Sequence, residues 1–320
     1  MKASGSSVGS FPLLLEVGGK EMDIREWLMS RKDELDRSLS IYGAIVIRGF
    51  PVLASRDLSD IAKILFDVPM RYIECSSPRS EFHPGIYSST DYRSDMTIPL
   101  HNENSYGSVW PRKMFFYCLV PPETGGETTL GDCRRILQRI APEVVGVFEK
   151  RKIKYRRHVG EGMGLTWQQI FQTGNREEMV AYCQQAGYGI LELEGGRMRI
   201  DRVGEAVRTH PGTGERVWFN HGAFFNVQTL PPELREAMEE IYRPDEYPIH
   251  TLYGDGAPIP ATQIEHIAGA YREECIPHRW QAGDLLLLDN MLCAHGRAPF
   301  TGERRILVTM CDPLFTEVGG

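Results

Sequence analysis

The sequence predicts a mostly β protein whose strands form an antiparallel barrel or sandwich, with helices confined to insertions. Short runs of strand length are separated by turn residues, as at 285–289, where four leucines are followed by Asp289-Asn290. These runs do not alternate regularly with helices, as a doubly wound parallel sheet would require. The chain has 320 residues, of which 42% are hydrophobic, and no shift in composition divides it. We therefore expect a single domain over 1–320 with a helical insertion around 134–245.

Hydrophobic periodicity predicts the elements in order. Apolar residues at helical spacing predict helices over 23–39 and 58–66, and the β-rich run 43–49 lies between them. The continuous apolar run 113–120 stops at two prolines and predicts a buried strand. Further helices are expected over 134–150, 166–185 and 230–241, and further strands over 127–130, 189–193, 198–200, 217–220, 285–289 and 305–310. The polar segment 75–95 predicts a long loop, which in a compact domain is usually functional.

The charge of the chain bears on its partners. The formal net charge is -7 and the sequence pI is about 5.8, whereas a nucleic-acid-binding surface needs a concentrated basic face. One basic run stands out, at 151–158, and its alternation predicts an edge strand with a charged outer face. The alternative for this run is a dock for an acidic partner. We expect no nucleic-acid partner.

Cysteine usage and the N-terminal sequence indicate the compartment. The seven cysteines are scattered and never spaced as CxxC, so neither a disulfide framework nor a zinc cluster is expected. The apolar stretch 12–15 is too short for a signal peptide or a membrane span. These features predict a cytoplasmic protein with no membrane association.

The run His101-Asn102-Glu103 is the strongest chemical signal in the chain. In a strand, side chains at i and i+2 lie on one face, so His101 and Glu103 can point at one atom. A His-x-Glu triplet is weak alone, but His295 follows a buried strand almost two hundred residues later. Two imidazoles and one carboxylate leave one side of a metal open, as in non-heme Fe(II) oxygenases.

Two adjacent arginines, Arg304 and Arg305, stand at the start of the last predicted strand. Alternation along that strand would send one of them inward. An inward guanidinium is costly unless it meets an anion, and its planar fork suits a carboxylate. The alternative is an internal ion pair with Asp or Glu.

Taken together, these motifs resemble the TauD/TfdA family of Fe(II)/2-oxoglutarate-dependent dioxygenases, in the branch similar to clavaminate synthase and syringomycin-pathway hydroxylases. The resemblance covers roughly residues 40–312 and rests on these motifs: His101-Asn102-Glu103, Gly125-Gly126-Glu127-Thr128, Asp289-Asn290, His295-Gly296-Arg297 and Arg304-Arg305-Ile306. It implies a double-stranded β-helix, or jelly-roll, core. It also implies that His101, Glu103 and His295 hold Fe(II), and that 2-oxoglutarate and O2 are cosubstrates.

The same resemblance implies a 2-oxoglutarate site made by Thr128 and Arg305. Arg304 is the less favoured partner, since neighbouring strand residues face opposite ways. Thr309 stands where the family's taurine-specific arginine would be, so a sulfonate substrate is not expected.

Several reaction outcomes remain open. Glu103 favours hydroxylation over halogenation, because related halogenases replace this carboxylate with a small residue. Desaturation, epoxidation and cyclisation share the same cofactors. One rival is a zinc hydrolase, but the sequence has no HExxH motif. Another is a cupin-like metal-binding protein without turnover.

The resemblance points to a small-molecule substrate. By analogy with the nearest branch, we expect an amino acid or an amino-acid-derived intermediate of specialised metabolism, free or tethered to an acidic carrier protein. Tyr106, Asn220 and Arg297 are the candidate substrate-binding residues.

Overall fold

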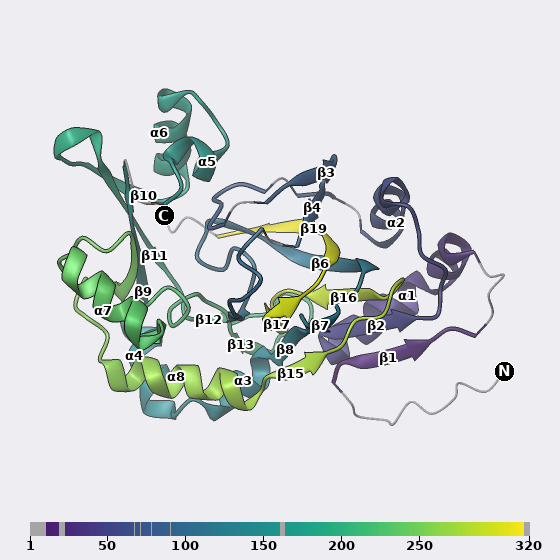
Figure 1. The fold of residues 1–320 in the computed structure, drawn as a ribbon. Helices are drawn as coiled ribbons and strands as arrows, with labels where there is room; N and C mark the ends of the chain where they lie inside the picture. The colour runs from purple at the N-terminus through teal and green to yellow at the C-terminus, as the bar shows by residue number, and fades with distance from the viewer. Residues whose placement is uncertain are drawn as a thin grey trace.

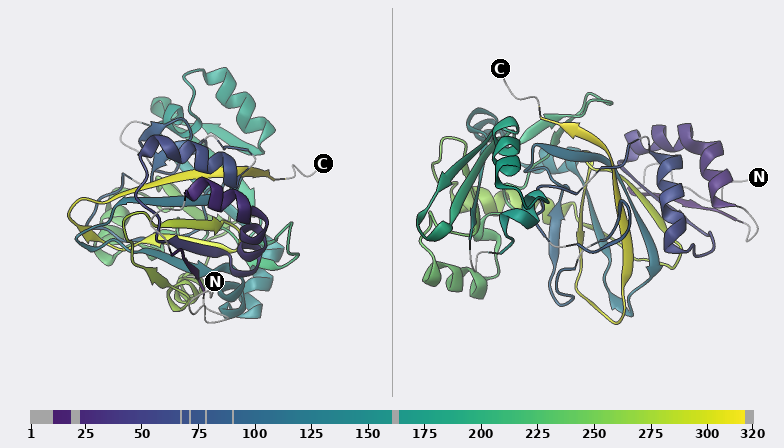
Figure 2. Two further views of the ribbon diagram at one scale, coloured as in Figure 1. Left: turned by 90° about the vertical axis from the view of Figure 1, so that its right-hand side faces the viewer. Right: turned by 90° about the horizontal axis from the view of Figure 1, so that it is seen from above.

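The computed structural model describes residues 11–18, 23–66, 68–70, 72–77, 79–89, 91–160 and 164–316. Figure 1 shows N-terminal helices, a core of strands drawn from both halves of the chain, and a lobe built from the middle of the chain. Seen from above in Figure 2, the lobe (teal and green) and the N-terminal helices (purple) lie at opposite ends of the core strands. The core strands therefore lie between the N-terminal helices and the lobe.

A seven-stranded sheet forms one half of the core. Its strands, in spatial order, are β1 (Leu13–Glu16), β2 (Ala44–Arg48), β16 (Leu285–Asp289), β6 (Val109–Val120), β19 (Arg305–Phe315), β4 (Ile86–Ser88) and β3 (Glu81–His83). The pair β1–β2 is parallel and the other pairs are antiparallel. Strands β3 and β4 belong to the segment predicted as a loop over 75–95, so that prediction is wrong for these residues.

Two helices, α1 (Ile24–Tyr42) and α2 (Leu58–Leu65), cover the outer face of this sheet, and a short 3-10 turn, η1 (Ser55–Asp57), leads into α2. Along β16, Leu285 and Leu287 pack with these helices, whereas Leu286 and Leu288 pack toward the second sheet. A strand buried on both faces needs apolar residues at every position. This explains the four consecutive leucines of the sequence.

The second sheet is four-stranded, in the order β15 (Ile276–His278), β8 (Thr128–Asp132), β17 (Cys293–Arg297), β5 (Ile98–His101). Leu130 and Cys293 from this sheet share one buried cluster with Phe116 and Val308 of the seven-stranded sheet. The two sheets therefore pack face to face, as the predicted sandwich requires. The strands β7 (Thr124–Gly125) and β18 (Phe300–Thr301) pair with each other as a separate two-stranded antiparallel ribbon.

The middle of the chain forms the lobe. Its helices are α3 (Cys133–Arg139), α4 (Pro142–Arg151), α5 (Trp167–Phe171), α6 (Arg176–Gln185), α7 (Pro232–Ile241) and α8 (Ala261–Glu273), with 3-10 turns η2 (Glu194–Gly196) and η3 (Val227–Thr229). Its strands are β9 (Ile153–Val159), β10 (Tyr188–Glu192), β11 (Met198–Gly204), β12 (Val207–Thr209), β13 (Arg216–Trp218) and β14 (Ile249–Tyr253). The segment predicted as a helical insertion over 134–245 thus also contains strands, and three of them join β14, just after the segment, in a sheet ordered β10-β11-β9-β14.

The basic run 151–158 lies mainly on β9, which pairs with β11 on one side and β14 on the other. The predicted edge strand is therefore a central strand. Some of its charges form ion pairs: the Arg156 Nη2 to Asp201 Oδ2 distance is 2.9 Å and the Lys152 Nζ to Glu205 Oε1 distance is 2.7 Å. In an antiparallel sheet with one solvent-exposed face, central strands also carry charged residues at alternating positions. The alternation therefore does not distinguish an edge strand from a central strand.

None of the helices in the described part of the chain has the length and apolar character needed to cross a membrane.

Candidate metal centre and its cavity

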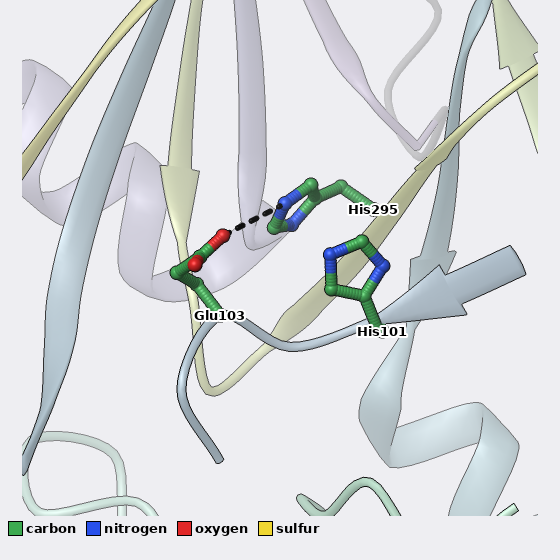
Figure 3. Close-up of side chains that lie close together, drawn as sticks. All are labelled: His101, Glu103 and His295. Carbon is green, nitrogen blue, oxygen red and sulfur yellow. Dashed lines mark ion pairs between the residues drawn. The ribbon is translucent and has the colours of Figure 1, made fainter. Parts of the chain in front are cut away.

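Three side chains, two from neighbouring strands and one from the turn after the first strand, converge on one point. His101 is the last residue of β5, His295 is the middle residue of β17, and the two stand directly opposite each other in the antiparallel pair. Glu103 follows two residues after His101, and its Oε2 lies 3.8 Å from His295 Nε2. One ligand atom from each of the three lies within 4.8 Å of the others. Figure 3 shows the three side chains pointing toward one another.

The two imidazoles are in the form that binds metals. His101 Nδ1 donates to the Pro99 carbonyl oxygen at 2.9 Å, which leaves Nε2 as the nitrogen with a lone pair. Burial lowers the pKa of His101 and lowers the pKa of His295 well below its usual range. Both rings are therefore neutral near pH 7, and His295 Nδ1 is buried with no hydrogen-bond partner among the described residues.

Glu103 is held through its backbone by one amide side chain. The Glu103 N–H donates to Asn290 Oδ1 at 2.8 Å, and Asn290 Nδ2 donates back to the Glu103 carbonyl oxygen at 2.9 Å. Asn290 belongs to the turn between β16 and β17, so it ties the first ligand segment to the second. A metal centre needs such outer support to fix its ligands.

The donor set fits Fe(II). Two imidazole nitrogens and one carboxylate oxygen on one side of an ion leave the other positions open, which suits non-heme Fe(II) chemistry with a cosubstrate. These three residues face a cavity of about 650 Å³. The residues that the sequence predicts as ligands are therefore brought together, beside space for small molecules.

Three parts of the molecule line the cavity. The core contributes Phe116, Thr128, Gly296, Arg297 and Arg304; the segment that leads into β5 and the start of that strand contribute Ser76, Ser77, Arg79, Ser89, Tyr92 and 95–99; the lobe contributes His221, Phe224, Phe225, 229–231 and Leu234. The lining includes Arg79, Arg297 and Arg304, and many of the other lining residues are apolar, a combination common in small-molecule sites.

Arg304 lines the cavity, whereas Arg305, the residue predicted to bind the cosubstrate, is not among the lining residues. Arg304 donates to Gly126 O and Ser89 Oγ, each at 3.1 Å, whereas Arg305 is half exposed and pairs with Glu303 at 2.6 Å. Strand β19 begins at Arg305 with a register irregularity before Ile306, so strict alternation does not reach back to this pair.

Burial, with the nearby charge of Arg297, lowers the pKa of Arg304 to about 10. An arginine pKa falls in this way when no anion compensates the buried charge. Thr128 lies beside Arg304, with Arg304 Nη2 at 3.5 Å from Thr128 Oγ1, and its hydroxyl also accepts from Trp280 Nε1 at 3.0 Å. Together Arg304 and Thr128 form a cradle suited to a carboxylate.

Of the three predicted substrate-binding residues, Arg297 alone lines the cavity. Its guanidinium donates to the backbone oxygens of Tyr92 at 3.0 Å and Met96 at 2.9 Å, and to that of Arg93, so it fastens this loop to the cavity wall. Tyr106 and Asn220, the other two predicted residues, are buried and do not line the cavity. Tyr106 donates to the Glu74 carbonyl oxygen at 2.5 Å and Asn220 to that of Ala206 at 2.8 Å.

Sequence reasoning missed other cavity residues. His221, next to the predicted Asn220, stacks edge-on to His101 with ring centroids 5.5 Å apart, and its Nδ1 lies 2.6 Å from Ser105 Oγ. Arg79, which also lines the cavity, forms a buried ion pair with Glu103. No motif marks Arg79, because it reaches the site through the folding of a loop.

Known proteins with related sequences and folds cover nearly the whole chain. The chain is 34% identical to the dapdiamide synthesis protein DdaC of Enterobacter agglomerans over 281 residues, covering 88% of this chain and 85% of the relative. It is 28% identical to a clavaminate synthase-like protein of Arabidopsis thaliana, covering 89% and 86%. PvcB from Pseudomonas aeruginosa shares the fold, with a TM-score of 0.54 at 18% identity and coverage of 94% and 86%.

A family model described as "Taurine catabolism dioxygenase TauD, TfdA family" matches residues 10–311. This match confirms the family that the motifs predict and, with it, Fe(II) and 2-oxoglutarate as the cofactor class. The chain belongs to the TauD/TfdA family of dioxygenases.

Proposed function

We propose that this dioxygenase hydroxylates an amino acid or an amino-acid-derived intermediate of specialised metabolism, and that its core is a double-stranded β-helix. One observation carries the proposal: the triad of His101, Glu103 and His295 opens into the same cavity as the cradle of Arg304 and Thr128. A metal-ligand set and a carboxylate site in one cavity are what an Fe(II)- and 2-oxoglutarate-dependent reaction needs.

Each residue has a distinct task in this proposal. His101, Glu103 and His295 would hold Fe(II), which when bound supplies the oxidising chemistry with O2 and 2-oxoglutarate. Arg304 and Thr128 would receive the distal carboxylate of 2-oxoglutarate, and Arg304 replaces Arg305 in this role. The apolar walls around them exclude water.

Hydroxylation is favoured over halogenation because Glu103 keeps a carboxylate in the ligand set. Desaturation, epoxidation and cyclisation would use the same residues, so product analysis must separate them. A zinc hydrolase would need a further base beside the metal. Glu103 is the sole carboxylate in the ligand group found among the described residues.

Two findings support the substrate class. A relative at 34% identity is named for dapdiamide synthesis, a biosynthetic role. The cavity also combines cationic groups with apolar side chains from the lobe, such as Phe224 and Leu234, as an acid with an apolar body would require. The proposal covers free and carrier-tethered substrates. All seven cysteines are free, in keeping with a reducing cytoplasm.

The test has two stages. Anaerobic protein is first titrated with Fe(II) and 2-oxoglutarate, and a weak visible absorption is expected only when both are present. A panel of amino acids and carrier-bound amino acids is then incubated in air, and succinate and products are followed by mass spectrometry. A product that gains one oxygen supports hydroxylation, whereas loss of two hydrogens indicates desaturation or cyclisation. Metal binding without the joint absorption would contradict the cosubstrate assignment.

A further inference from the structure

Arg79 is a buried arginine that lines the proposed active-site cavity. Its Nη2 donates to Glu103 Oε2 at 2.6 Å, and the side chains of Arg79 and Glu103 are only 6% and 4% exposed. The guanidinium lies over the ring of Tyr72, with its central carbon 4.8 Å from the ring centroid. Arg79 is therefore fixed next to the metal ligands, within the cavity wall.

Most of the hydrogen-bonding capacity of Arg79 is unused. Nε and Nη1 are both buried and have no hydrogen-bond partner among the described residues. Leaving a buried charged donor unpaired costs more than leaving a neutral one. The one partner, Glu103, would also share its negative charge with a bound dication, so it compensates Arg79 only in part.

The charge balance of the cavity with metal and 2-oxoglutarate bound also favours a further anion. Among the described residues that line it, the charged groups with buried side chains are three arginines and one carboxylate, since Asp95 is 60% exposed and pairs with Arg93. A divalent metal and a 2-oxoglutarate dianion cancel each other. Two positive charges therefore remain in excess, and a further anion would offset part of this excess.

The other two arginines are already engaged. All three nitrogens of Arg304 have protein contacts within 3.5 Å and face the cradle with Thr128. Both terminal nitrogens of Arg297 hold backbone oxygens of the loop over 92–96. Arg79 is thus the cavity-lining arginine with two idle nitrogens in the described structure. Ser76 and Ser77 line the same cavity close by in the sequence and offer hydroxyl donors.

We propose that Arg79 binds a carboxylate of the primary substrate and so makes the enzyme selective for anionic substrates. This inference rests on the proposed function, because it requires a second organic acid beside 2-oxoglutarate. A guanidinium favours carboxylates over neutral amides because the hydrogen bonds are charge-assisted.

The test uses acetate as the probe and needs no turnover. The protein is loaded with Mn(II), saturated with 2-oxoglutarate, and the relaxation of the methyl protons of added acetate is measured by NMR. Acetamide serves as the neutral probe of the same shape. We expect clear relaxation of acetate and at least about fivefold less for acetamide, since a charge-assisted pair contributes about 1 kcal/mol or more over a neutral one.

Variants assign the effect to Arg79. Arg79→Gln should reduce the acetate effect at least about fivefold, Arg79→Lys should keep part of it, and Arg93→Gln, which alters an exposed arginine, should leave it unchanged. Equal relaxation of acetate and acetamide, or an undiminished effect in Arg79→Gln, would overturn the proposal. Relaxation of the 2-oxoglutarate protons is recorded in the same samples, so a failed cosubstrate site is told apart from a failed Arg79 site. If Arg79→Gln proves unfolded by circular dichroism, the Arg79→Lys and acetamide comparisons decide.

Discussion

The strand core and the lobe contribute different things to one cavity. The core supplies the three candidate ligands: His101 and His295 lie on the paired strands β5 and β17, and Glu103, just after β5, is tied to the turn before β17 by Asn290. The lobe supplies much of the apolar wall, partly from α7, a helix with no buried residue. Reactions need ligands held to a fraction of an ångström, whereas substrate walls tolerate variation. The comparison therefore assigns chemistry to the core and substrate selection to the lobe.

The sharpest test removes a core ligand. His101→Ala or His295→Ala should abolish substrate-dependent succinate formation and tight Fe(II) binding, because a three-ligand site has no spare imidazole. Glu103→Ala should also eliminate hydroxylation. Metal binding is measured by titration and succinate by mass spectrometry, with His83→Ala on β3 as a control histidine outside the site. Near-native turnover in a folded ligand variant would place the metal elsewhere.

The next effect compares two neighbouring arginines of the core. Arg304→Ala should raise the 2-oxoglutarate concentration needed for half-maximal rate by a factor of tens to thousands, since a buried charge-assisted pair is worth about 2–5 kcal/mol. Arg305→Ala should change it less than about twofold, because Arg305 pairs with Glu303 on the surface. Steady-state kinetics at varied 2-oxoglutarate measures both. A larger effect of Arg305→Ala than of Arg304→Ala would mean that the two side chains exchange their orientations when the cosubstrate binds.

The core was also the more predictable region. Strands β2, β6 and β16 are apolar on both faces, so their sequences show continuous hydrophobic runs. The two-residue spacing also predicts that His101, the last residue of β5, and Glu103, just after the strand, face one point. Strand β17 is harder to predict, since His295, Gly296 and Arg297 interrupt its pattern. The two-residue alternation also could not predict whether Arg304 or Arg305 faces the cavity, because the register of the strand is irregular at its start.

In the lobe, the sequence signals are weaker. The strand β14 and the helix α8 are not predicted from the sequence, and β9 has the alternation of an edge strand although it is central. Tyr106 and Asn220 carry polar groups that suggest a binding role, but internal backbone oxygens satisfy them. Arg79 could not be predicted, since its contact with Glu103 depends on the path of a loop through space.

A smaller effect is expected from the lobe wall. Leu234→Ala on α7 removes part of an apolar side chain that lines the cavity and is 44% exposed, so folding should be little affected. The loss of contact should raise the substrate KM by about three- to tenfold, or roughly 1 kcal/mol, and leave the 2-oxoglutarate requirement unchanged. Steady-state kinetics with the substrate from the panel and an anaerobic titration measure the two effects separately. A change in 2-oxoglutarate affinity would show that the lobe also shapes the core site.

The last prediction concerns acid stability rather than activity, and it asks whether the two regions unfold together. Burial lowers the pKa of His278 on β15, in the core, and of His250 on β14, in the lobe, from 6.5 to about 4. Because the unfolded chain takes up these protons first as pH falls, stability is complete above about pH 6.5 and is lost progressively toward pH 4, by about 2 kcal/mol per histidine between pH 7 and pH 5. Urea unfolding at several pH values should show this slope, and His278→Gln and His250→Gln should each flatten it. If core and lobe unfold as one cooperative unit, both variants change the pH dependence of the same unfolding transition. Two unfolding transitions, with His250→Gln changing only the first, would show that the lobe unfolds independently of the core.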